Sequence, residues 1–525
     1  MKNLLIIASL LTSGVYAADI ADEWRASGRL NAYIENIDVS GGSSTSDKEG
    51  TTHDEELSLR FAGPLQGGQA GVDIRARGTN DSRIQKDGFE LLYLHAYFIT
   101  KIWRLEVGDV AASYNPYVYG GSVKGIKAVY TSPKKDHTWN YSMIAGYKKS
   151  LWREVYTKDQ YEVPTGYSGA FEAKYIHERS KEIAISAASY QDDLSTGDTN
   201  STNLGKKGVS IGVDGRWRFN RYVTLKGQFA IVDATDDLSH GKPTSSSNAL
   251  LLKVLTKPNL RSIRSNFTYT RVGTDFISLS GSAPQDTEQF ENSNTWRINQ
   301  KLSARLGLRA RRDNLDGSLG GTQRVYYENL SFSYRPDFIK RSDINVRFSN
   351  RDTKGRGTDT GSQTAGIDMN VRRKDGWRYG VGYEYNKLTD HNSSLNTSTT
   401  NSIRTTIGYK KRIDKEKSYR VTVGLNYQRV KSSNVNNNYG IKLDMGYDYS
   451  RRLALDFYYL SRYAYQDISN DTQNSTYQFR VTYRLDPKGR QIIRLLLEQI
   501  HYDVEDDATN SYNQFRGKLS YSLNF

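Results

Sequence analysis

The chain ends in the stretch Phe515 to Phe525, FRGKLSYSLNF, in which apolar and polar residues alternate at every second position. One alternate set contains Phe, Gly, Leu, Tyr, Leu and Phe, and the other contains Arg, Lys, Ser, Ser and Asn. Successive side chains of a β-strand point to opposite faces of a sheet, so a period of two residues is the strand period. The stretch therefore predicts a strand with one apolar face and one polar face.

The same alternation recurs from Arg25 onward, in runs of about ten residues that are separated by turns or loops. Clear examples are residues 377–386, 419–428 and 477–485, where aromatic and aliphatic residues occupy every second position. One such run alone is weak support for a strand, but its repetition over most of the chain is specific. The pattern predicts an all-β protein.

The predicted connections also alternate, between short turns and long polar loops. The short ones are residues 63–68, 132–135, 219–221, 257–259, 373–376, 414–417, 450–452 and 486–489. The long ones are residues 40–53, 192–207, 352–362 and 389–401. Tight turns at one end and long loops at the other are typical of bacterial outer-membrane barrels.

Counting strands under this constraint gives about 26, an even number, as single-chain bacterial barrels require, and 24 stays open. Long and short connections continue to alternate along the chain only if residues 272–300 are not read as one loop and one strand. One strand is then expected near 287–299 and another near 302–312, with a tight turn between them. Both chain ends are expected on the side of the short turns, the periplasm.

Composition fits a barrel that spans a membrane. Residues 1–17, MKNLLIIASLLTSGVYA, read as a cleaved signal peptide with a positive start and a short apolar core. No other apolar run of about 18 residues occurs, so a closed barrel over residues 18–525 is the remaining way to cross lipid. Half of each strand then faces water, which explains a mean hydropathy of −0.69. The 38 tyrosines suit aromatic girdles at the two interfaces.

The ending Tyr521-Ser522-Leu523-Asn524-Phe525 resembles the C-terminal signal of Gram-negative outer-membrane β-barrel proteins. That resemblance implies recognition by the barrel-assembly machinery, with Tyr521, Leu523 and Phe525 as the residues that carry the signal. Together with the signal peptide and the strand pattern, it covers nearly the whole chain, and it implies location and architecture rather than function.

Basic residues predominate at the positions expected to face the lumen in the second half of the chain. A basic lumen attracts an anionic solute, polymer or acidic partner, although pairing of these charges along a hydrated wall is the alternative. The predicted pore-lining residues are Arg305, Arg309, Arg347, Arg378, Arg404, Arg420, Lys442, Arg480, Arg484, Arg494, Arg516 and Lys518.

Two segments do not fit the simple pattern of strands and polar loops. Residues 106–125 join two strands through an aromatic-rich loop, and residues 271–290 form a long, partly apolar outer loop. The first of them is a candidate for a constriction that folds into the lumen, and a hydrophobic surface loop is the alternative. The candidate constriction residues are Asp109, Tyr114, Tyr117 and Tyr119.

The size of the barrel raises the question of what fills it, because barrels of 22 strands already carry a plug. The first strand is expected near Arg25, so an N-terminal plug of the kind found in TonB-dependent transporters is not expected. Surface loops that fold inward, or a separate protein, would then occupy the lumen.

Two classes of function follow, a channel and a scaffold. The first is a wide, basic-lined porin or export channel for an anionic solute or polymer. The second is a sleeve around a multihaem cytochrome, because the predicted barrel resembles in architecture the barrel component of porin–cytochrome electron conduits. Any haem would belong to that partner, since the chain has no Cys and therefore no C-x-x-C-H motif.

An enzyme is the third alternative, and the sequence disfavours it. The seven His residues are scattered without metal-site spacing, and neither an acid–base constellation nor a G-x-S-x-G elbow is found. Basic residues alternate along strands rather than clustering with stacking aromatics, which disfavours nucleic-acid binding. No catalytic, metal or cofactor residues are predicted.

Overall fold

The computed structural model describes residues 23–42, 49–81, 88–148, 152, 165–178, 180–193, 205–235, 238, 243–259, 262–277, 284–317, 320–393, 396–467 and 469–525. The predicted signal peptide, residues 1–17, lies outside the described residues. Within the described part of the chain, no helix has the length and apolar character needed to cross a membrane.

The described residues form 26 strands. Their bounds are β1 Arg25–Gly41, β2 Gly50–Leu65, β3 Gly68–Thr79, β4 Phe89–Ile99, β5 Trp103–Ser113, β6 Gly120–Pro133, β7 His137–Lys148, β8 Thr165–His177, β9 Lys181–Asp193, β10 Lys207–Arg218, β11 Val223–Thr235, β12 Ser245–Asn259, β13 Ile263–Val272, β14 Thr287–Arg297, β15 Leu302–Asp313, β16 Arg324–Tyr334, β17 Ser342–Gly355, β18 Thr358–Arg372, β19 Trp377–Asp390, β20 Ser398–Arg412, β21 Ser418–Lys431, β22 Val435–Asp448, β23 Leu453–Gln466, β24 Thr472–Arg484, β25 Gln491–Val504 and β26 Tyr512–Asn524.

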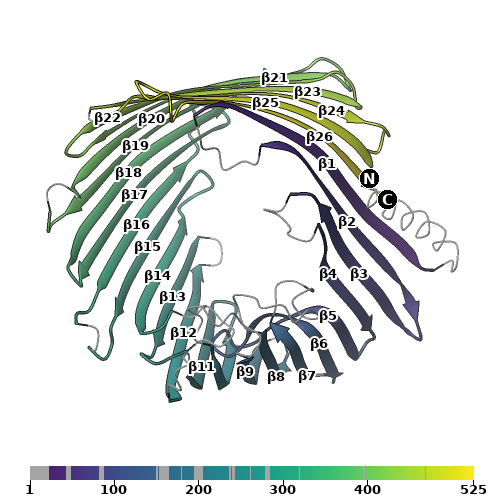
Figure 1. Ribbon diagram of the computed structural model, residues 1–525. Coiled ribbons are helices and arrows are strands. Elements are labelled where there is room, and N and C mark those ends of the chain that lie inside the picture. The colour runs from purple at the N-terminus through teal and green to yellow at the C-terminus, as the bar shows by residue number, and fades with distance from the viewer. Residues whose placement is uncertain are drawn as a thin grey trace.

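The strands close into one antiparallel barrel (Figure 1). Each strand pairs with its neighbours in sequence, and β1 pairs with β26 from Arg29↔Asn524 to Gly41↔Tyr512. The predicted even number of 26 strands is confirmed. The division of residues 287–312 into two strands is confirmed as well, because β14 and β15 meet across a turn at residues 298–301.

The apolar alternate set of each strand faces outward. Met143 pairs with Phe171 and Ile211 pairs with Ile231, and these four side chains are 46–55% exposed. A soluble protein does not leave so large an apolar surface in water, whereas a bilayer covers it. The fold and this surface define a membrane-spanning β-barrel of the outer-membrane type.

Aromatic rings gather on the outer face near the short turns. Trp103 lies 4.7 Å from Tyr130 between ring centroids, and Trp139 lies 4.9 Å from Tyr175. Trp377 and Tyr409 repeat the arrangement on another part of the wall, at 4.7 Å. Rings with an apolar body and a polar edge suit the membrane interface, so this row marks the periplasmic boundary of the lipid-facing band.

Several expected loops are shorter than the sequence predicted, among them residues 389–401, because β19 continues to Asp390 and β20 starts at Ser398. Residues 352–362 are not a loop, because β17 continues to Gly355 and β18 starts at Thr358. Gly355, Arg356 and Gly357 all have positive φ, which allows a tight hairpin turn to replace the loop. Strand β2 takes the end of the expected 40–53 loop, and the 106–125 connection shrinks to residues 114–119.

Candidate functional site

Strands β5 and β6 leave the wall near its extracellular end and form a hairpin in the lumen. The ladder between β4 and β5 runs from Ile99↔Arg104 to His95↔Gly108, whereas β5 and β6 stay paired as far as Ser113↔Gly120. Gly108 has a φ of +105°, and a Cβ there would lie 2.1 Å from the Leu94 carbonyl oxygen. Only glycine permits this inward turn. Residues 109–124 are called the inner hairpin below.

The inner hairpin packs against the lumen face of the wall. Val110, Val118 and Tyr119 are each 1% exposed and belong to one apolar cluster. Each large side chain that is fully buried in this way contributes on the order of 2 kcal/mol. The wall contributes residues that alternate with the lipid-facing set, and they are mostly small: Ile144, Ala170, Ala188, Ala230, Val232, Ala234, Ala249 and Val272.

Hydrogen bonds fix the tip of the inner hairpin to the wall. Asn115 is fully buried, and its Nδ2 donates to the carbonyl oxygens of Val213 and Phe229, at 3.3 and 3.2 Å. The Ser210 hydroxyl donates to the Val118 carbonyl oxygen at 3.3 Å. Because a buried polar group without a partner is costly, these bonds specify where the tip lies.

The second segment that the sequence left unplaced joins the same cluster. Phe276 and Ile277, which follow β13, are 1% and 7% exposed. The Phe276 ring meets the Tyr117 ring edge-on, with centroids 6.0 Å apart. The two unusual segments therefore belong to one packed unit inside the barrel.

The candidate constriction residues divide into two groups. Tyr114 bonds to the Ser142 hydroxyl at 2.8 Å, and Tyr117 and Tyr119 are buried against the wall. Burial raises the pKa of Tyr114 to about 12 and also raises the pKa values of Tyr117 and Tyr119, so all three phenols remain neutral at ordinary pH. These three side chains anchor the inner hairpin rather than project into open lumen.

Asp109 lies at the base of the inner hairpin, apart from the apolar cluster. Its carboxylate accepts hydrogen bonds from Lys124 Nζ at 2.6 Å, from Trp152 Nε1 at 2.7 Å and from the Leu94 N–H at 2.8 Å. The side chain thus supplies β4 with an acceptor where the backbone of β5 turns away.

The strand register places all twelve predicted pore-lining residues on the face opposite the exposed apolar set. For example, Arg404 pairs with Gly382 between Tyr383 and Val381, which are 40% and 56% exposed on the other face. The remaining eleven follow the same alternation on β15, β17, β19, β21, β22, β24, β25 and β26. Their role in conduction stays a prediction.

Half of these twelve residues have carboxylate partners. Arg347 binds Asp368 and Glu384, and Arg404 Nη2 lies 3.7 Å from Asp368 Oδ1. The other paired residues are Arg309 with Glu291, Arg420 with Asp444 and Asp456, Arg516 with Glu35 and Glu498, and Lys518 with Glu35.

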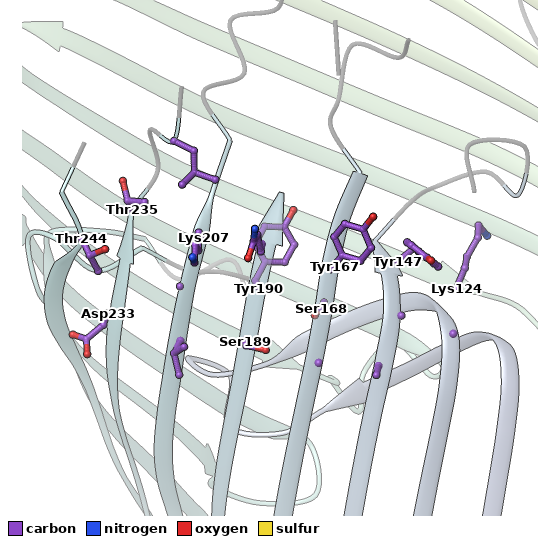
Figure 2. A pocket seen from close by; sticks show the side chains of 18 of the residues that line it. Lys124, Tyr147, Tyr167, Ser168, Ser189, Tyr190, Lys207, Asp233, Thr235 and Thr244 are labelled. Atoms are coloured by element: carbon purple, nitrogen blue, oxygen red, sulfur yellow. The ribbon is translucent and has the colours of Figure 1, made fainter. Parts of the chain in front are cut away.

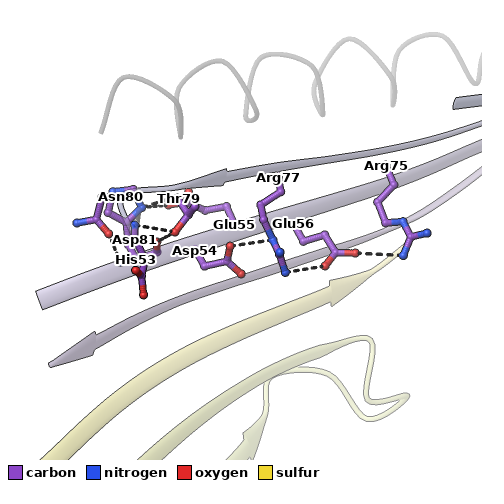
Figure 3. A network of polar contacts seen from close by, with 9 residues as sticks. All are labelled: His53, Asp54, Glu55, Glu56, Arg75, Arg77, Thr79, Asn80 and Asp81. Atoms are coloured by element: carbon purple, nitrogen blue, oxygen red, sulfur yellow. Dashed lines mark hydrogen bonds and ion pairs between the residues drawn. The ribbon is translucent and has the colours of Figure 1, made fainter. Parts of the chain in front are cut away.

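The first strands show the same pairing. Arg77 Nε lies 3.0 Å from Asp54 Oδ1, and Glu56 lies between Arg77 and Arg75 (Figure 3). Cross-strand pairs of this kind hold neighbouring strands in register on the lumen face.

The other six predicted residues have no ion-pair partner in the described part of the chain. Among the residues that the structure describes, no carboxylate lies within ion-pair distance of Arg305, Arg378, Lys442, Arg480, Arg484 or Arg494. Arg484 donates instead to the Arg451 carbonyl oxygen at 3.2 Å, and Lys442 lies over the Tyr458 ring. The lumen therefore keeps uncompensated positive charge.

A further concentration of cations lies at the periplasmic end of β10 to β15, where the sequence analysis named only Arg305. Two adjoining cavities of about 480 and 660 Å³ share Arg264 and Thr295, and no described Asp or Glu lines either of them. The basic patch consists of Arg216, Arg218, Lys226, Arg264, Arg297 and Arg305. Of these six residues, only Arg216 has an acidic partner within the described chain, Glu182 at 3.1 Å. Alternation of basic residues along 216–226 and 295–305 was the available signal.

Arg347→Met is expected to lower the free energy of unfolding by about 1 kcal/mol, because Asp368 and Glu384 would then face each other without the guanidinium. The value is small since the three side chains are 27–41% exposed. Urea unfolding in lipid vesicles measures it. Arg305→Met, which breaks no described ion pair, is the control, and an equal loss in both variants would contradict the argument.

Of the C-terminal signal residues, Tyr521 and Leu523 belong to the lipid-facing set of β26, and Phe525 closes the seam with β1. The Phe525 N–H donates to the Gly28 carbonyl oxygen at 3.0 Å, and the Gly28 N–H donates to the Phe525 oxygen at 2.9 Å. A Cβ on Gly28 would lie 2.5 Å from the Phe525 ring. The last residue is therefore a structural part of the closed barrel.

Within the described residues, no group of three or more His, Cys, Asp or Glu side chains is arranged to hold a metal ion.

Comparison with known proteins gives likeness only at the level of solved structures. No family model matches the chain, and no curated protein matches it. The siderophore receptor PirA of Pseudomonas aeruginosa aligns over 95% of this chain and 80% of its own, with 9% identity and a TM-score of 0.41. The P pilus usher PapC translocation pore aligns over 95% and 99%, with 10% identity and a TM-score of 0.39. Pseudomonas aeruginosa OccK2 aligns over 96% and 98%, with 10% identity and a TM-score of 0.30.

Proposed function

We propose that the protein is an outer-membrane channel that passes an anionic solute or polymer through a basic lumen. The observation that carries the proposal is the basic patch, six cations on strands β10, β11, β13, β14 and β15 with one described acidic partner. Fixed positive charge on a low-dielectric wall raises the local concentration of anions and repels cations. The net charge of +15 acts in the same direction.

The inner hairpin supports a selective rather than an open passage. It lies in the extracellular half of the lumen, and the basic patch lies at the periplasmic end of the neighbouring wall. An anion that enters from the periplasm meets the cations first and the narrowed section second.

A channel and a sleeve for a multihaem cytochrome differ in what the purified protein does alone. The channel conducts in a planar lipid bilayer without any partner. The sleeve co-purifies with a haem-stained protein in mild detergent and does not conduct when its occupant is bound. Conductance of the partner-free protein supports the channel, and a stoichiometric haem protein with no conductance would overturn it.

We also propose that the barrel-assembly machinery reads Tyr521, Leu523 and Phe525 at the periplasmic end of β26. Deletion of Phe525 is expected to lower the amount of folded barrel in the outer membrane several-fold, because it removes the signal and both seam bonds to Gly28. Asn524→Ala, which changes the adjacent lumen-facing residue, is the control. Heat-modifiability on gels measures folded protein, and unchanged levels after the deletion would refute the assignment.

A further inference from the structure

The inward turn of β5 leaves the wall incomplete between β4 and β6. Strand β4 continues from His95 up to Phe89 and stays paired with β3 over that length, but its ladder with β5 stops at His95↔Gly108. The residues that follow Gly108 do not pair with β4, because they form the inner hairpin. On the β5 side, the upper half of β4 therefore has no strand beside it within the described chain.

This break lies within the lipid-facing band. Phe89 is 57% exposed on the outer face of β4 beside the break, and Val107 and Ile126, just below the break, are 55% and 51% exposed. Leu94 belongs to the same outward set, since it pairs with Ile74. The break therefore opens in the apolar surface itself and not above it.

Asp109, Lys124 and the Leu94 N–H form a polar cluster, called the knot below, at the lower limit of the break. Asp109 binds both the Leu94 N–H on β4 and the Lys124 ammonium on β6, and the Lys124 ammonium lies 4.8 Å from the centre of the Trp152 ring. The Lys124 side chain is only 2% exposed. A buried ion pair in the lipid-facing set is expensive unless it replaces missing backbone bonds, and Asp109 does this for Leu94.

A cavity of about 1100 Å³ adjoins the knot on the outer face (Figure 2). It begins at Lys124 and Ile126 and follows the extracellular ends of β6 to β11. Its floor is made of small or apolar members of the lipid-facing set, among them Ala145, Gly169 and Val209. Tyr147 and Tyr167, with ring centroids 5.2 Å apart, border it at the height expected of the upper interface.

We propose that the break between β4 and β6 is a lateral opening through which the acyl chain of a lipid amphiphile passes between the outer leaflet and the lumen. The surrounding bilayer supplies the occupant, because the break and the cavity are continuous with the apolar outer surface. On the lumen side, Arg75, Tyr93 and His95 offer polar contacts to a head group. Backbone that faces hydrocarbon must find polar partners, and an open path to lumen water provides them for the edge of β4.

The absence of cysteine from the chain makes a direct test possible. Single cysteines carrying a bimane fluorophore are placed at Tyr93, Thr405 and Thr406, and the protein is reconstituted in vesicles with brominated phosphatidylcholine, which quenches only by contact. Tyr93 lies on the lumen face beside the break, since it pairs with Arg75. Thr405 faces lipid, and Thr406 faces the lumen behind complete ladders on both sides.

Bromolipid is expected to quench the label at Thr405 strongly, the label at Tyr93 to a comparable extent, and the label at Thr406 hardly at all. Quenching at Tyr93 that matches Thr406 would overturn the lateral opening. If Tyr93→Cys does not fold, Arg75→Cys takes its place on the next strand, where weaker but clear quenching is expected. This experiment does not measure ion selectivity, so it tests the lateral opening independently of the proposed anion channel.

Discussion

Gly212→Val is expected to raise the single-channel conductance several-fold, because it drives the inner hairpin off the wall. Gly212 lies on the lumen face of β10, directly beneath the hairpin tip. A Cβ there would lie 2.6 Å from Val118 Cγ2 and 2.9 Å from Asn115 Nδ2. Real Cβ atoms do not approach other atoms so closely, and overpacking of this kind costs about 1–3 kcal/mol. The same displacement breaks the bonds from Asn115 to the Val213 and Phe229 carbonyl oxygens.

Gly424→Val is the matched control for this substitution. Gly424 also faces the lumen in mid-strand, on β21, but its nearest neighbour is Lys442 Cβ at 3.6 Å, which leaves room for the added side chain. Its conductance should stay near that of the parent protein. Equal conductance of the parent and both variants would mean that the inner hairpin does not narrow the passage. An equal rise in both variants would point to general loosening of the barrel.

Reversing the charge of the basic patch is expected to abolish or invert anion preference. The triple variant Arg264→Glu, Arg297→Glu and Arg305→Glu places three carboxylates around the two adjoining cavities, where the structure shows no described acid. The zero-current potential in a salt gradient measures the change. The shift should be largest at 0.1 M salt, where charges act over about 10 Å, and should shrink at 1 M, where they act over about 3 Å.

A second triple variant carries the same change in charge on the other face of the barrel. Arg324, Lys354 and Lys387 belong to the lipid-facing set at the extracellular ends of β16, β17 and β19. Their replacement by Glu should leave selectivity close to that of the parent. If the two triple variants shifted the potential alike, net charge rather than the lumen wall would govern selectivity.

The barrel was predictable from the sequence because its signal is local. The alternation of apolar and polar residues indicates each strand, and the requirement for an even number of strands predicts two strands within residues 287–312. The failure at residues 352–362 has an equally local cause. Polar loop composition and the tight Gly355-Arg356-Gly357 turn look alike in one sequence, since the positive φ values that shorten the hairpin are not visible there.

The position of the inner hairpin was not predictable in the same way. Its binding surface is assembled from mostly small residues on six strands, among them Ala170, Ala230 and Val272, and no strand carries more than three of them. Aromatic residues marked the connection as unusual. They did not show that Tyr117 packs against Phe276 of another loop, because contacts so distant in sequence arise only from closure of the barrel.

The position of the basic patch was also not predictable from the pattern of any single strand. The lumen-facing positions of the second half could be assigned because those strands alternate cleanly. Arg216, Lys226 and Arg264 lie on strands whose lumen faces also carry small, polar or acidic residues, so the pattern of any one strand is ambiguous. Only the register between strands places these cations side by side.

The zero-current potential of the unmodified mature protein in a planar bilayer, under a tenfold gradient of KCl, is the most direct test of a basic lumen that selects anions. The sign that reports preferential chloride flux is the predicted result. A potential near zero, or one that reports preferential potassium flux, would contradict the account.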